Sequence, residues 1–79
     1  MLRVGKESKQ NGSKILQDAA TYFGEELGLT IAERNENSVH FTGPGGHVLV
    51  QVGSSDAGTE VDIQTQEFEY DVKQFLQKI

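Results

Sequence analysis

The chain has 79 residues and a net charge of −5, with seven Lys and Arg against twelve Asp and Glu. Binding to nucleic acid or to an anionic membrane needs clustered basic side chains, so we expect neither kind of partner. The chain contains no cysteine, which excludes disulfides, thiolate metal sites and a catalytic thiol. Its length predicts a single domain over residues 1–79, and without an apolar run long enough to span a bilayer we expect a soluble, cytoplasmic protein.

The N-terminal residues show a weak strand pattern followed by a helix pattern. Residues 1–5 predict a short edge strand with Val4 facing inward, and the polar residues 6–12 predict a loop. From Ser13 to Leu27, apolar residues recur every three or four positions and predict an amphipathic helix. Asn11 or Ser13 can cap its start, and Gly28 is placed to end it in the left-handed conformation.

The middle of the chain alternates between apolar and polar residues, which is typical of half-buried strands. Four strands are predicted, separated by three turn signals: Asn35-Glu36-Asn37, Gly43–Gly46 and Gly53–Gly58. The residues that share the inward face are Leu29, Ile31, Val39, Phe41, Val48, Val50, Val52, Val61 and Ile63.

The lengths of two turns predict how these strands pair. A four-residue loop over 43–46 places Phe41 opposite Val48. A six-residue loop over 53–58 places Val50 opposite Val61 and Leu49 opposite Asp62. Because side chains alternate with a period of two, both pairings keep apolar residues on one face of the sheet.

Residues 66–79 predict a closing helix, with Thr65 as its N-cap and an apolar stripe through Phe68, Val72, Phe75, Leu76 and Ile79. The predicted fold class is therefore α+β, a two-layer sandwich of order (β)-α-β-β-β-β-α, with both helices on one face of an antiparallel meander sheet. This order resembles one repeat of the TATA-binding-protein fold and a shortened helix-grip domain. The resemblance is one of topology alone and implies no function.

The glycine-rich loop from Thr42 to His47 first suggests a phosphate-binding loop. Such a loop needs to open a helix, so that amide groups and the helix dipole meet the anion. Here the loop joins two strands and no lysine follows it. A hairpin turn, in which Pro44 fixes φ and a glycine supplies positive φ, is the better interpretation.

Two histidines and an aspartate face outward in the predicted register. His40 and His47 are diagonal neighbours on adjacent strands, about 7 Å apart at Cα. Asp62 lies two strands away from His40, so a site with two histidines and one carboxylate can be drawn, with poor geometry. Two exposed polar residues on a sheet are the simpler interpretation, and we expect no catalytic residue, bound metal or cofactor.

The outer face of the sheet is the surface that the predicted elements leave uncovered. Leu49 lies near its centre among neutral polar residues, which suits a modest protein interface. The candidate interface residues are Ala32, His40, Thr42, His47, Leu49, Gln51 and Asp62.

Because small domains often gain stability by associating, we expect a non-catalytic binding module that forms a homodimer or binds another protein. One alternative is a binder of a small apolar ligand, held between helices and sheet. The least favoured alternative is an enzyme or metal site at His40, His47 and Asp62.

Overall fold

A computed structural model describes residues 2–56 and 58–79. It contains one antiparallel sheet with strand order β1-β5-β4-β3-β2. The strands are β1 (Leu2–Ser8), β2 (Thr30–Arg34), β3 (Ser38–Gly43), β4 (Gly46–Ser55) and β5 (Gly58–Gln66). The helical segments are α1 (Gly12–Ala19), η1 (Ala20–Glu26) and α2 (Glu69–Leu76).

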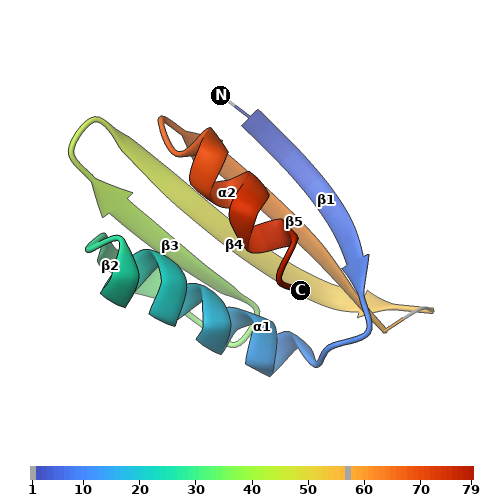
Figure 1. The fold of residues 1–79 in the computed structure, drawn as a ribbon. Coiled ribbons are helices and arrows are strands. Elements are labelled where there is room, and N and C mark those ends of the chain that lie inside the picture. Colours follow the sequence, from blue (N-terminus) through green and yellow to red (C-terminus); the bar gives the residue numbers. More distant parts are fainter. Residues whose placement is uncertain (1, 57) are drawn as a thin grey trace.

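The helices form the second layer. Figure 1 shows α1 and α2 on the same side of the sheet, with the other side left open. The architecture is therefore the predicted α+β two-layer arrangement with a meander of strands β2 to β5. Among the described residues, no helix is long and apolar enough to cross a membrane.

The core lies between the two layers and is made of the predicted apolar residues. Their side chains alternate along β3, β4 and β5, and the helices contribute an apolar stripe from above. The buried apolar residues are Ile15, Leu16, Ala19, Phe23, Leu29, Val39, Phe41, Val48, Val50, Val61, Ile63, Val72 and Phe75. Phe23 packs against both Phe41 and Phe75, with ring centroids 5.4 and 5.3 Å apart.

The first helix begins and ends close to the predicted positions but changes its winding. The side-chain oxygen of Asn11 accepts a hydrogen bond from the amide of Ser13 at 2.8 Å, so Asn11 is the N-cap. From Ala20 to Glu26 the helix is a π-helix, and the amide of Leu27 donates to the carbonyl of Tyr22, five residues earlier. Gly28 then takes a positive φ of 76° and ends the helix as predicted.

Two residues of the predicted apolar pattern are exposed instead of buried. Leu27, at the end of the helix, is 37% exposed, and Ile31 in β2 is 41% exposed. Strand β2 is a sheet edge and all five of its residues are exposed. A strand at an edge has a neighbour on one side only, so its inward side chains are covered less completely.

The N-terminal strand is longer than predicted. Residues 6–8 continue β1 beside β5, and the loop expected over 6–12 is reduced to 9–11. Lys6 and Ser8 lie on the inner side, opposite Val61 and Thr59. Lys6 is polar, so the sequence pattern did not indicate a strand here. In the structure its ammonium group donates a hydrogen bond to the carbonyl of Leu76 at the end of α2.

The closing helix starts later than predicted. β5 continues to Gln66, so Thr65 is a strand residue and not an N-cap. Its side chain is fully buried, and its hydroxyl donates to the carbonyl of His47 at 2.8 Å. Phe68 takes the N-cap position without a side-chain hydrogen bond. The turn into the helix passes through Glu67, which has a positive φ of 77°.

The pairing of β3 with β4 is confirmed, and that of β4 with β5 is corrected by two residues. Phe41 lies opposite Val48 as predicted. Val50 lies opposite Ile63, not Val61, because the ladder between β4 and β5 continues as far as the pair of Ser55 and Gly58. A shift of two residues leaves every side chain on its predicted face, so the alternating pattern could not distinguish the two registers.

Candidate functional site

The site is the open outer face of the sheet, which we define by the outward side chains of its five strands. The register places these side chains in rows across the strands. Its members are Arg3, Glu7, Thr30, Glu33, Ser38, His40, Thr42, His47, Leu49, Gln51, Glu60, Asp62, Gln64 and Gln66. Neither helix packs on this face (Figure 1).

The central row differs from the predicted one. His40 lies opposite Leu49, as expected, but Leu49 lies opposite Gln64, and Asp62 lies one row away, opposite Gln51. The middle of the face is therefore neutral over three adjacent strands. The sequence pattern missed Gln64 as a member of this row because of the two-residue error in register.

The charged side chains of the central row stand at its two ends. Glu33 in β2 is paired with His40, and Arg3 in β1 is paired with Gln64. The sequence pattern missed both residues, because Arg3 joins the face only once β1 is known to pair with β5. Glu33 reaches it through a β-bulge between Ile31 and Glu33, which makes the exposed Ala32 the extra residue of that strand.

Asp62 is engaged by Arg3. The guanidinium Nη2 lies 2.7 Å from a carboxylate oxygen, and Nε lies 3.2 and 3.3 Å from the two oxygens. This contact raises the pKa of the Arg3 guanidinium above its ordinary value, chiefly through the hydrogen bond and then through the charge of Asp62. The ion pair is solvent-exposed and therefore contributes little to stability, but it removes Asp62 as a partner for the histidines.

The two histidines are brought together as the sequence predicted. Their ring centroids are 5.6 Å apart and the rings meet edge to face at 81°. Both side chains are half-buried although no helix covers them. Within residues 2–56 and 58–79, no three His, Cys, Asp or Glu side chains are grouped closely enough to hold a metal ion, so one chain supplies the histidine pair alone.

The Gly-Pro-Gly-Gly loop is a tight turn between β3 and β4. Gly43 pairs with Gly46, and Gly45 has a φ of +81°, which follows Pro44 as in a type II turn. Gly46 has a further role, because a Cβ there would collide with the main-chain oxygen of Gln66. The lack of a side chain at Gly46 therefore lets the segment between β5 and α2 pass close to the loop. No helix begins at the loop.

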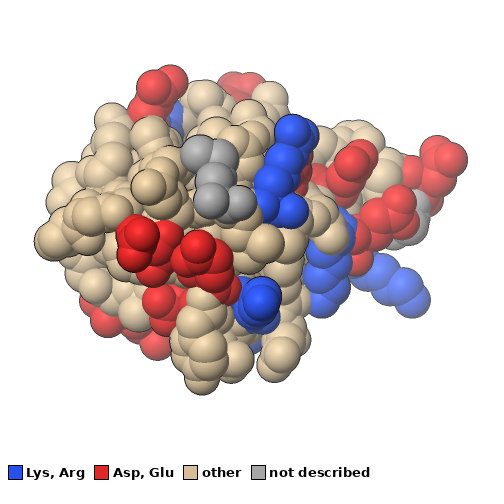
Figure 2. Space-filling view, turned by 90° about the horizontal axis from the view of Figure 1, so that it is seen from above, with Lys and Arg blue, Asp and Glu red and all other residues tan. Residues whose placement is uncertain are grey.

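Acidic residues outnumber basic ones in the chain, twelve to seven. Figure 2 shows carboxylate side chains gathered in groups on the face seen there, with basic side chains beside them.

Around Tyr22, burial raises the pKa of the phenol above its ordinary value, and the nearby carboxylates of Asp71 and Glu26 raise it further. The ammonium of Lys78 lies over the same ring, 4.4 Å from its centroid.

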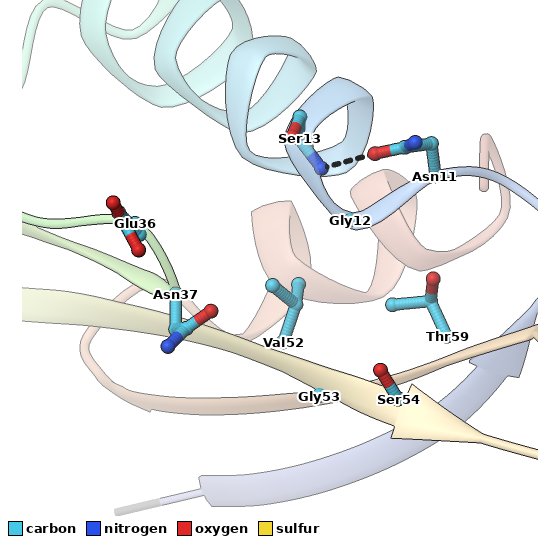
Figure 3. A pocket seen from close by; sticks show the side chains of 9 residues that line it. All are labelled: Asn11, Gly12, Ser13, Glu36, Asn37, Val52, Gly53, Ser54 and Thr59. Atoms are coloured by element: carbon cyan, nitrogen blue, oxygen red, sulfur yellow. Dashed lines mark hydrogen bonds between the residues drawn. The ribbon is translucent and has the colours of Figure 1, made fainter.

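Hollows occur at the margin of the helical layer. One of about 180 Å³ lies beside the start of α1 and is lined mainly by polar residues, including Asn11, Asn37 and Thr59 (Figure 3). A second, of about 210 Å³, lies between Tyr22, Phe75 and Lys78. A third, of about 320 Å³, borders Ile31 and Arg34. These hollows open at the surface, so they give no support to the alternative of an apolar ligand held between helices and sheet.

Comparison with known proteins adds a fold and no function. No protein-family model matches the chain, and a search of curated proteins finds no significant match. Among solved structures, the chain is similar to the protein SSP2350 from Staphylococcus saprophyticus, with a TM-score of 0.61 and 17% sequence identity. The match covers 94% of this chain and 76% of that one. At this identity the likeness shows that the α+β fold is shared.

Proposed function

We propose that this protein is a non-catalytic interaction module that forms a homodimer through the outer face of its sheet. The observation that carries the proposal is the arrangement of that face: a neutral row of His40, Leu49 and Gln64 at the centre, with charged residues at the margins. Depletion of charge at the centre with a polar rim is typical of protein interfaces. We also propose the cytoplasm as its compartment, on the composition of the chain.

The strand order favours a second copy of the chain as the partner. β4 is the middle strand of five. A two-fold axis parallel to β4, between two outer faces, would bring those faces into contact with the two β4 strands opposite each other. Leu49 of each copy would then meet at the axis. Arg3, at one end of the central row, would face Glu33 of the second copy at the other end. The ends of the central row would thus be complementary in charge between the two copies.

The size of the face sets the expected strength of the dimer. Strands about 4.8 Å apart and about 24 Å long give an area of about 500 Å² per copy, or about 1,000 Å² for the pair. This is close to the lower limit for a specific interface. We therefore expect a weak dimer, with a dissociation constant in the micromolar range or above.

Sedimentation velocity over a range of protein concentrations tests the proposal. Leu49→Asp should abolish the concentration-dependent dimer while leaving the circular dichroism spectrum unchanged, because an outward side chain is replaced. Ile31→Asp is the matched control: it places the same charge on the exposed edge strand β2, away from the outer face. A wild-type protein that stays monomeric at millimolar concentration would refute the homodimer. A dimer lost in Ile31→Asp and kept in Leu49→Asp would place the interface at the strand edge instead.

A further inference from the structure

We infer that the dimer proposed above holds a divalent late transition metal, of which Zn²⁺ is the type, between His40 and His47 of one copy and the same two residues of the second. The inference rests on the proposed function, because the site is incomplete in one chain. It is carried by the histidine pair on the outer face, whose ring centroids lie 5.6 Å apart.

The separation of the rings fits shared coordination of one ion. A zinc–nitrogen bond of about 2.1 Å puts each imidazole centroid about 3.2 Å from the metal, so two ligands at a tetrahedral angle have centroids about 5.2 Å apart. The observed 5.6 Å is close to this value. A small rotation of either side chain, both of which lie on an uncovered face, would bring the two nitrogens to one ion.

The second copy supplies what one chain lacks. Structural zinc sites have four protein ligands, and within the described residues no third acidic or histidine side chain joins the pair. Asp62 is held by Arg3 instead. Two sheets pack about 10 Å apart, and a histidine side chain reaches about half that distance. With the two-fold axis along β4, the His47 side chains meet across the axis, and the His40 side chains stand on either side of the axis in the adjacent row, beside Leu49.

The donor atoms select the class of metal. Imidazole nitrogen suits Zn²⁺, Cu²⁺ and Ni²⁺, whereas Mg²⁺ and Ca²⁺ require oxygen ligands. The near neighbours of the pair across the strands are neutral, Thr42 opposite His47 and Leu49 opposite His40, apart from Glu33 on the far side of His40. A metal bridge would also strengthen an interface that is small by itself.

The experiment measures the dimer dissociation constant by sedimentation equilibrium in EDTA, in Mg²⁺, and with half an equivalent of ZnCl₂ per chain. We expect Zn²⁺ to tighten the dimer at least 100-fold and Mg²⁺ to leave it unchanged. The two histidines are the only ones in the chain, so both imidazole proton resonances should shift in the NMR spectrum and titrate at one metal per two chains.

His40→Gln and His47→Gln should each abolish the zinc effect and keep the weak dimer in EDTA. Thr42→Ala, which alters a neighbour on the same face, is the matched control and should retain the zinc effect. A dimer that forms equally in EDTA and Zn²⁺ would overturn this inference and leave the proposed function standing. One zinc bound per monomer without dimerisation would overturn the bridging site. A chain that stays monomeric under all conditions would refute both proposals.

Discussion

The side-chain ammonium of Lys6 in β1 donates a hydrogen bond to the main-chain carbonyl of Leu76, the last residue of α2, at 2.5 Å. The two residues are 70 positions apart. A cation at a helix C-terminus satisfies a carbonyl that has no partner within the helix and interacts favourably with the helix dipole. This contact ties the first strand to the last helix.

Replacing Lys6 by methionine keeps the apolar stem and removes the charged donor. We expect Lys6→Met to lower the free energy of unfolding by about 1.5–3 kcal/mol, since hydrogen bonds that involve charged groups contribute about this much. Urea unfolding followed by circular dichroism measures the change. Lys9→Met is the control, because Lys9 is exposed and lies beyond the strand. Equal losses in the two variants would show that the contact with Leu76 contributes nothing specific.

The close passage at Gly46 predicts a severe effect of adding one methyl group. In Gly46→Ala the Cβ would strike the main-chain oxygen of Gln66 and lie 2.8 Å from the Cβ of Glu67. Overpacking against backbone is expected to cost about 2–3 kcal/mol of unfolding free energy. Gly53→Ala, where no atom lies within 4 Å of the added Cβ, should change it by less than about 0.5 kcal/mol. Similar values for both variants would contradict this account of the loop.

Glu67 is the one described non-glycine residue with a positive φ, at 77°. A side chain in this conformation costs about 1–2 kcal/mol, and a glycine there loses about 0.4–1 kcal/mol through the greater freedom of the unfolded chain. We therefore expect Glu67→Gly to stabilise the protein slightly, by about 0.5 kcal/mol, as measured by urea unfolding. Glu69→Gly, in the first turn of α2, should destabilise it by about 0.5–1 kcal/mol. A destabilising Glu67→Gly would argue against strain at this turn.

The raised pKa of Tyr22 predicts a loss of stability in alkaline solution. Burial and the carboxylates of Asp71 and Glu26 favour the protonated phenol in the folded state. The folded protein therefore binds the proton more tightly than the unfolded chain does. This contribution is complete below the unfolded pKa of about 10 and is lost as the pH rises through the folded value. Unfolding free energies between pH 9 and 11 should fall with pH, and less steeply in Tyr22→Phe. Identical slopes would contradict the prediction.

The charges at the ends of the central row predict a pattern of dimer affinities. Glu33→Lys would place a cation opposite Arg3 of the second copy and should weaken the dimer about two- to fivefold, as expected for charges at the rim of an interface. Adding Arg3→Glu should restore much of the affinity by exchanging the two charges. Sedimentation equilibrium measures both variants. If the double variant is weaker than either single one, the two residues do not face each other.

The sequence by itself determined which face of each central strand is buried. The alternation through Val39, Phe41, Val48 and Val50 has only one solution that puts apolar side chains together. It also determined the end of the first helix at Gly28, because a positive φ there favours glycine. The fold class follows from these elements, since a sheet and two helices that are each apolar on one side must cover one another.

The tertiary structure decided the features that local pattern leaves open. A two-residue shift between β4 and β5 keeps every side chain on its face, so only the whole sheet fixes Leu49 opposite Gln64 and leaves Asp62 to Arg3. Lys6 and Thr65 are polar residues in inward positions, and each is accommodated by a distant carbonyl that no local pattern reveals. The sequence thus specifies which residue types lie on the outer face, and the long-range pairing of the strands determines how those residues are arranged in space.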